Sequence, residues 1–403
     1  MLSYEQARKT VTEKVGQNIG PIATVELSVW AALGFVLARE IRADRDYPPF
    51  DRSTRDGYAV RAAEISAGAR IRCAGEIKAG DELTTPLAPA ECTQIMTGAA
   101  IPSGANAVVM IEHVHSEDHF IVFSRSAQPG QNIVPRASEG SAGQTLLAAG
   151  TRLGFAELSL AAQVGATKIN CAKKPRVAIL STGDEIVSVD AVPGPFQIRN
   201  SNAVSLAAQV QLAGGEPIAI GNAVDRPEDL REKIKLGLRA DVLVLSGGVS
   251  MGKYDLVESV LKEMGAQFFF DAVAIRPGKP AVFGVCQGKP VFGLPGNPVS
   301  TMVTFELFVT PAIDLLSGAQ ARPLPLVEVQ LAEPMHEKPG MSHFLPARIE
   351  WNGPSTQVKP LRWQGSGDVT ALTKANCFLV IPADREKIEA GDKVSVILRK
   401  DMI

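Results

Sequence analysis

The stretch Arg176-Val177-Ala178-Ile179-Leu180-Ser181-Thr182-Gly183-Asp184-Glu185 decides the fold, because an apolar run ends there in small and acidic residues. The pattern recurs where the apolar run 241–245 leads into Ser246-Gly247-Gly248-Val249-Ser250. Such runs are typical of strands that are buried on both faces of a parallel sheet. Ligands bind at the carboxyl ends of these strands, so both small-residue loops are expected to face one pocket.

The residues around these two runs alternate between helix and strand patterns. Apolar spacing and a Gly-Gly stop predict a helix over about 202–214. Further elements are predicted as a strand at 217–220, a charged helix at 228–238, a helix at 256–264 and a strand at 268–274. This alternation predicts one open, doubly wound α/β sheet.

Two more loops are expected at the same edge of the sheet, Arg276-Pro277-Gly278-Lys279-Pro280 and Leu294-Pro295-Gly296-Asn297-Pro298-Val299-Ser300. Gly-rich turns at helix starts direct N–H groups at an anion, and Arg276 and Lys279 would add positive charge. A phosphorylated ligand is therefore expected. The site also contains carboxylates, which would repel a phosphate unless a hard cation such as Mg²⁺ bridges the two; they are Asp184, Glu185, Asp225 and Asp255.

Each motif also has a purely structural explanation. A Gly-Gly pair after a strand is about as often a simple tight turn as a functional loop. Asp184 and Glu185 suit the first turn of a helix, and Asp225 before Arg226-Pro227 suits a turn. Only their co-occurrence at the ends of consecutive strands favours a binding site.

These segments resemble the signature of the molybdopterin molybdenumtransferase family, which includes bacterial enzymes and the C-terminal domain of gephyrin. The match extends through Ser246–Asp255 and includes upstream segments, namely Pro48-Pro49-Phe50-Asp51, Asp56-Gly57-Tyr58-Ala59-Val60-Arg61 and Ile95-Met96-Thr97-Gly98-Ala99. Because separated segments match in the family's order, the resemblance covers nearly the whole chain.

The chain is expected to be a multidomain α/β protein with four parts. Helix patterns at 3–17, 27–41 and 156–164 predict a helical linker, which the resemblance makes a dimerisation region. Short strands with Gly and Pro between them predict the two β parts. The boundaries are 1–45 with 137–172 for the helical region, 46–136 for an inserted small β domain, 173–320 for the molybdopterin-binding α/β domain and 323–403 for a C-terminal β-barrel-like domain.

The resemblance implies a reaction in which molybdate joins the dithiolene of adenylylated molybdopterin and AMP is released, with Mg²⁺ as cofactor. It implies catalytic roles for Asp56, Thr97, Glu185, Asp225, Asp255 and Lys279, of which Glu185, Asp225 and Asp255 would hold the metal. Asp56 and Thr97 would reach the site from the partner subunit of a homodimer. Substrate contacts are assigned to Ser181, Thr182, Gly183, Ser246, Gly247, Gly248, Ser250, Arg276, Lys279, Pro295, Gly296, Asn297 and Ser300.

Two other functions are compatible with this fold. A related domain adenylylates molybdopterin with ATP, and gephyrin acts as a scaffold without needing turnover. The chain also departs from the family pattern, because Met341 stands where the family usually has an arginine. This departure leaves open a preference for tungstate and a substitute role for Arg348 or Arg362. Separately, the resemblance implies an anion-binding hydroxyl near residues 365–370, which could be that of Ser366 or of Thr370.

The composition sets limits on partners and location. The chain has 403 residues, a net charge of -2 and 45% hydrophobic residues, which predicts roughly two to four globular domains and no general attraction to nucleic acid or membrane. Its 5 cysteines form no CxxC pair, which suits a reducing compartment. A cytoplasmic location is expected, with the molybdopterin adenylyltransferase and cofactor-accepting enzymes as further partners.

Overall fold

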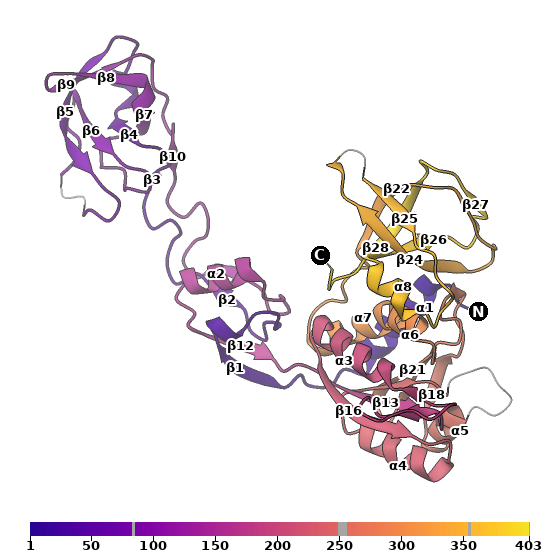
Figure 1. Ribbon diagram of the computed structural model, residues 1–403. Coiled ribbons are helices and arrows are strands. Elements are labelled where there is room, and N and C mark those ends of the chain that lie inside the picture. The colour runs from indigo at the N-terminus through magenta and orange to yellow at the C-terminus, as the bar shows by residue number, and fades with distance from the viewer. Residues whose placement is uncertain (83–84, 249–255, 354–355, 403) are drawn as a thin grey trace.

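A computed structural model describes residues 1–82, 85–248, 256–353 and 356–402. Figure 1 shows an elongated molecule in which an arm leaves a larger body and carries a small β domain at its far end. We call residues 24–172 the arm, and residues 1–17 together with 173–403 the body. The prediction of a multidomain α/β protein is confirmed.

The centre of the body is a six-stranded sheet in the order β16-β13-β17-β21-β20-β18. The first four strands run parallel, and β20 pairs antiparallel with both β21 and β18. The predicted strand at 268–274 is shorter than expected, because only its first part joins the sheet. The strand bounds are β16 (Glu216–Ala223), β13 (Arg176–Thr182), β17 (Val242–Ser246), β21 (Lys289–Leu294), β20 (Val282–Cys286) and β18 (Gln267–Phe270).

Helices cover both faces of this sheet. Along β13, Val177 and Ile179 face one core cluster, whereas Ala178 and Leu180 face another, as expected for a strand buried on both sides. The first face is covered by α3 (Ser201–Ala213), α1 (Tyr4–Gln17) and the continuous helical stretch α6 (Pro298–Thr304), η4 (Phe305–Val309) and α7 (Thr310–Leu316). The second face is covered by α4 (Pro227–Gly237) and α5 (Leu256–Glu263). The doubly wound prediction is confirmed.

The first helix belongs to the body and not to the arm. Ser3 caps α1 in a capping box with Gln6, which satisfies amide groups that the first turn leaves unpaired. Ala7, Val11 and Val15 are at most 1% exposed and pack in the core beside the sheet. The chain thus begins in the body, leaves it for the arm and returns at residue 173.

The predicted helix at 27–41 is wrong. Residues Thr24–Ser28 form β1, which pairs antiparallel with β12 (Lys168–Ala172), and only the short 3₁₀ turn η1 (Val29–Ala31) follows. Gly34 has φ +78°, which ends any helical continuation, and Leu33 is 64% exposed. The remaining elements of this region are β2 (Ile41–Arg42), β11 (Thr145–Leu147) and α2 (Phe155–Gln163), which confirms the helix predicted near 156–164.

The β domain at the end of the arm has the sheet order β7-β4-β6-β5-β9-β8. The short strands expected of a small β domain are present, and they are β4 (Gly57–Val60), β5 (Arg70–Ile77), β6 (Glu91–Ile95), β7 (Ala107–Met110), β8 (Val114–Glu117) and β9 (Phe120–Phe123). The chain enters and leaves through the paired strands β3 (Arg52–Ser53) and β10 (Ile133–Val134).

The C-terminal part is a small closed barrel, because β26 pairs with both β24 and β28. It confirms the predicted barrel-like domain. Its strands are β22 (Leu326–Leu331), β24 (Ser342–Glu350), β25 (Gln357–Pro360), β26 (Cys377–Ile381) and β28 (Lys393–Leu398), with the helix α8 (Val369–Lys374) beside them. The strand β19 (Ile275–Arg276) of the α/β domain pairs with β24 and joins the two parts of the body.

One helical stretch among the described residues, Pro298–Leu316, is long and apolar enough to cross a membrane by length and composition. Its most apolar window is 78% buried inside the protein, as expected of a helix that lies in a core.

Candidate functional site

A pocket of about 440 Å³ opens at the carboxyl ends of β13, β17 and β21. This is where the sequence predicted that the small-residue loops converge. Predicted residues that line it are Ser181, Thr182, Gly183, Glu185, Asp225, Ser246, Gly247, Gly248, Pro295, Gly296 and Asn297. Ser250 and Asp255 were assigned to the same site and lie outside the described residues.

The glycines after β17 allow two loops to approach closely. Gly247 and Gly248 have φ +89° and +63°, a region that favours glycine. A Cβ on Gly247 would lie 2.7 Å from the carbonyl oxygen of Thr182, and a Cβ on Gly248 would lie 2.5 Å from Thr182 Oγ1. The floor of the pocket therefore needs glycine at both positions.

Asn202 is a pocket residue that the sequence analysis missed. It lies in the first turn of α3, and its Nδ2 donates to Ser246 Oγ at 2.8 Å and to the carbonyl oxygen of Gly296 at 2.7 Å. It thus ties the loops after β17 and β21 together. The signal was present in the sequence, because Asn200-Ser201-Asn202 stands at the start of the predicted helix, and Asn200 indeed caps it.

Two buried polar atoms at this pocket, Thr182 Oγ1 and Asn202 Oδ1, have no hydrogen-bond partner among the residues that the structure describes. Buried polar atoms are normally hydrogen-bonded, so unpaired ones at a pocket are available to a bound molecule. The pocket therefore offers a hydroxyl and an amide oxygen to a ligand.

Glu185 and Asp225 line the acidic side of the pocket, and Asp184 lies next to Asp225. The backbone N–H of Asp225 donates to Asp184 Oδ1 at 3.1 Å, which holds the two loops together. Partial burial raises the pKa of Asp225, and the negative charges of Asp184 and Glu185 raise that pKa further. In the part of the chain that the structure describes, no three acidic, histidine or cysteine side chains are close enough together to form a metal site.

The predicted cationic loop lies beside this pocket. Pro280 lines the pocket, whereas Arg276 and Lys279 do not. Arg276 lies in β19 and is the register partner of His343 in β24, so the barrel fixes the start of this loop. Gly278 has φ +111°, and a Cβ there would lie 2.6 Å from Thr304 Cγ2, so the loop packs tightly on α6.

The turn after β21 is held by the C-terminal part of the chain. Asn297 Nδ2 donates to Ser366 Oγ at 2.9 Å, and the N–H of Val299 donates to the carbonyl oxygen of Ser366. Of the two hydroxyls left open by the sequence, Ser366 is therefore the one that contacts a pocket residue. Other predicted groups lie off the pocket: Ser300 is buried at 3% exposure, and Met341, Arg348 and Arg362 do not line it.

Asp56 and Thr97 lie together but far from this pocket within one chain. Asp56 Oδ1 accepts a hydrogen bond from the backbone N–H of Thr97 at 2.7 Å. Both residues are in the β domain at the end of the arm, which Figure 1 shows well separated from the body. A single chain does not bring them to the other predicted site residues.

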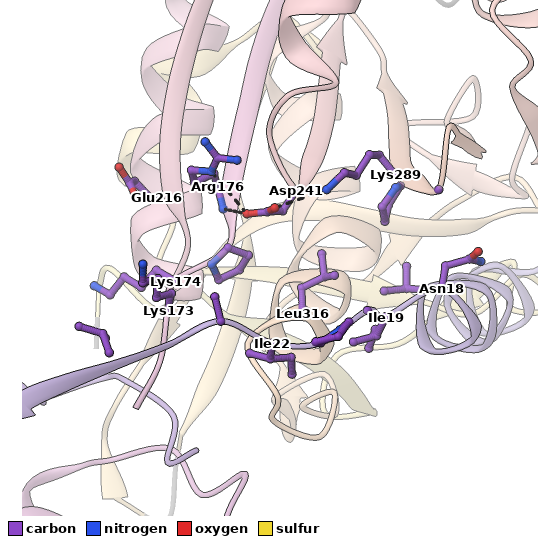
Figure 2. Close-up of a pocket in the computed structure, with 18 of the residues that line it drawn as sticks. Asn18, Ile19, Ile22, Lys173, Lys174, Arg176, Glu216, Asp241, Lys289 and Leu316 are labelled. Carbon is purple, nitrogen blue, oxygen red and sulfur yellow. Dashed lines mark hydrogen bonds and ion pairs between the residues drawn. The ribbon is translucent and has the colours of Figure 1, made fainter. Parts of the chain in front are cut away.

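A larger cavity, of about 760 Å³, lies at the opposite edge of the sheet, where the arm joins the body. Figure 2 shows its charged groups, among which Arg176 and Lys289 lie 3.7 and 3.6 Å from the carboxylate of Asp241. Much of its wall is the connecting segment around Ile19 and Ile22. The charged groups of this larger cavity pair with one another, and its other wall is made of apolar residues of the connecting segment, so the cavity is a space between domains. The smaller pocket is therefore the candidate site.

Family models cover most of the chain. They are the MoeA N-terminal region (domain I and II) over residues 2–165, the probable molybdopterin binding domain over 178–315 and the MoeA C-terminal region (domain IV) over 328–398. The fold and the pocket thus define a multidomain protein built around a molybdopterin-binding domain.

Comparison with whole proteins narrows this class to one family. The chain is 34% identical to a molybdopterin molybdenumtransferase of Nostoc sp., over 92% of this chain and 88% of the relative, and 33% identical to that of Haemophilus influenzae, over 98% of both. It also resembles two solved molybdopterin biosynthesis MoeA proteins of Pyrococcus horikoshii. Their TM-scores are 0.73 at 34% identity and 0.81 at 29%, with at least 99% of each chain covered.

The chain therefore belongs to the molybdopterin molybdenumtransferase family, transferases of molybdenum cofactor biosynthesis. The resemblance that the sequence motifs indicated is confirmed.

Proposed function

We propose that this protein joins molybdate to the dithiolene of adenylylated molybdopterin and releases AMP in a Mg²⁺-dependent step. The observation that carries the proposal is the meeting of acidic and anion-binding features in one pocket. Glu185 and Asp225 line it together with the glycine loop after β17 and the turn at Asn297. A substrate with a phosphoanhydride can enter beside these carboxylates if a cation accompanies it.

The loops of the pocket would bind the substrate's polar groups. The glycine loop with Ser246 and Ser250, and the turn at Asn297, would hold the pterin phosphate through N–H and hydroxyl groups. Thr182 Oγ1 and Asn202 Oδ1, which are unpaired within the described part of the chain, would also hydrogen-bond to substrate. Arg276 and Lys279 would hold the oxyanions and stabilise developing negative charge.

The metal would be held by Glu185, Asp225 and Asp255, the last outside the described residues. Carboxylate oxygens are the donors that Mg²⁺ prefers, and the raised pKa of Asp225 supports this assignment because a cation would relieve its repulsion from Asp184 and Glu185. When bound, Mg²⁺ would supply charge neutralisation at the phosphoanhydride. No side-chain nucleophile is needed. An oxygen of water, or of molybdate followed by hydrolysis of the resulting adenylyl-molybdate, would form the new bond to the AMP phosphorus as the anhydride P–O bond breaks. The two dithiolene sulfurs would bind molybdenum as one molybdate oxygen leaves as water with the two thiol protons.

Asp56 and Thr97 would complete this site from the partner subunit of a homodimer. The arm exposes large apolar side chains, with Trp30 94% exposed, Phe155 88% and Leu33 64%. Single exposed apolar residues are ordinary, but three of this size on neighbouring parts of one arm suit a subunit interface. The molybdopterin adenylyltransferase would supply the substrate in the cytoplasm, and cofactor-accepting enzymes would take the product.

The proposal is tested by measuring AMP release from adenylylated molybdopterin, with and without Mg²⁺, molybdate and tungstate. Release that requires both Mg²⁺ and molybdate is the expected result. Stronger stimulation of AMP release by tungstate than by molybdate would indicate that the oxyanion site prefers tungstate. Tight binding of the substrate without AMP release under any condition would contradict the proposal and favour a scaffold, and adenylylation of molybdopterin by ATP would favour the adenylyltransferase.

A further inference from the structure

The arm is tied to the body by a buried carboxylate. Asp314 in α7 is fully buried, and its Oδ1 lies 3.0 Å from Arg152 Nη2 and 2.7 Å from Arg322 Nη2. Its Oδ2 accepts from the backbone N–H and the Nε of Arg322, at 2.9 and 3.0 Å. Both carboxylate oxygens are therefore satisfied, one of them in part by a residue of the arm.

Arg152 connects the arm to the body. Its Nη1 donates to the carbonyl oxygen of Gly34 in the arm at 2.9 Å, while its Nη2 reaches Asp314 in the body. Space for the guanidinium is left by Gly214 at the end of α3, where a Cβ would lie 2.6 Å from Nη1. Burial and the nearby charge of Arg322 lower the pKa of Arg152. The side chain is thus mostly buried, with 24% of it exposed, and both of its terminal nitrogens are hydrogen-bonded.

Few other contacts fix the direction of the arm. Among the residues that the structure describes, the Arg152–Asp314 pair is the only ion pair or side-chain hydrogen bond that crosses from arm to body. The other side-chain attraction is the ammonium of Lys174 over the ring of Phe35, 4.7 Å from its centre. The cavity of Figure 2 lies beside this junction and is lined by the connecting residues 18–23. An ion pair between Arg152 and the buried carboxylate of Asp314 is suited to hold the arm in one orientation relative to the body.

We propose that Arg152 and Asp314 form a lock that sets the direction of the arm, so that Asp56 and Thr97 reach the partner subunit's pocket at the right place. Arg152 is a positioning residue, and it touches no pocket residue. This inference rests on the proposed function, in which the arm completes the site of the other subunit. Rigid placement matters because a displacement of about 1 Å at a reacting centre can cost roughly 100-fold in rate.

The test compares Arg152→Met with Arg322→Met. Each variant removes one arginine from Asp314, but only the first releases the arm, so the second controls for the loss of an ion-pair partner. Arg152→Met is expected to lower kcat for AMP release by about 100-fold with little change in the KM for adenylylated molybdopterin, because the pocket itself stays intact. Arg322→Met is expected to retain most of the wild-type kcat. Both variants are expected to lower the melting midpoint, because each removes an arginine from a fully buried carboxylate.

Two structural measurements do not depend on turnover. Small-angle X-ray scattering should show a broader distribution of interatomic distances for Arg152→Met than for Arg322→Met, and hydrogen exchange should rise in residues 34–37 and 150–153. If Arg152→Met keeps the wild-type scattering curve and exchange, the lock is refuted. If both variants lose kcat equally, it is also refuted. An inactive wild type would overturn the proposed function instead, and the scattering comparison would still decide whether the lock exists.

Discussion

At the scale of single residues, the pocket depends on positions where a side chain has no room. Gly248 combines φ +63° with two close neighbours, because an added Cβ would lie 2.5 Å from Thr182 Oγ1 and 2.9 Å from Val257 Cγ2. Gly248→Ala is expected to destabilise the protein by about 1–3 kcal/mol through strain and displacement of these neighbours. Gly288→Ala is the matched control, because Gly288 has φ +75° but no atom within 4 Å. Chemical denaturation should show the larger loss at position 248, and equal losses would contradict the packing argument.

The acidic side of the pocket predicts a pH dependence of stability without metal. Because the folded-state pKa of Asp225 is raised, its ionised form destabilises the fold at pH values above that pKa, and the penalty disappears as the pH falls below the ordinary value of 3.8. Asp225→Asn is expected to raise the melting midpoint at pH 7, by an amount that shrinks on acidification. Added Mg²⁺ should raise the midpoint of the wild type more than that of the variant.

The neighbouring Asp229 is the control, because its pKa is shifted in the opposite direction. The N–H of Val224 and the ammonium of Lys233 lower its pKa, so its carboxylate stabilises the fold above the ordinary pKa, and this gain is lost as the pH falls through the lowered one. Asp229→Asn should therefore lower the midpoint at pH 7. Thermal melts of both variants between pH 4 and 8 would contradict the assignment if the two shifts had the same sign.

At the scale of elements, α1 is expected to be as stable as the sheet on which it packs. Val11 is fully buried between α1 and the body, so Val11→Ala should cost about 1.5–3 kcal/mol in the unfolding of the body. Glu13→Ala, on the exposed face of the same helix, should change little, since it loses only a 3.8 Å surface ion pair with Lys9. Amide hydrogen exchange in residues 4–17 should be as slow as in β13. An exchange rate that matches the arm instead would show that α1 is not part of the body's core.

Elements also explain where sequence-based prediction succeeded. The apolar runs before Ser181 and Ser246 are long and end in loops with distinctive residues, so the sheet and its pocket could both be predicted. The segment 27–41 failed because its apolar residues at helical spacing belong to a strand and a turn, which pairing with residues 168–172 stabilises. Such pairing between distant segments is not encoded in local periodicity. The role of Arg152 could not be predicted either, since its partner Asp314 is 162 residues away.

At the scale of the whole molecule, the separation of Asp56 from the pocket predicts complementation between subunits. Asp56→Asn and Asp225→Asn dimers should each be inactive. A mixed dimer would contain one pocket with both carboxylates, because the intact arm of one subunit meets the intact pocket of the other. Such mixed dimers should recover about half of the wild-type AMP release. Purified heterodimers without activity would show that each chain completes its own site.

The position of α1 has a consequence for synthesis on the ribosome. The helix is synthesised before the arm, yet the sheet and the helix α7 that bury it are completed only about 300 residues later. The arm lies between them in sequence and contains its own core clusters, so it can fold while α1 still lacks its partners. During this interval Val11 and Val15 are exposed to the cell, and a chaperone that binds short apolar helices would find them there. Folding of the body is thus completed when α1, which is synthesised before the arm, docks on the sheet last.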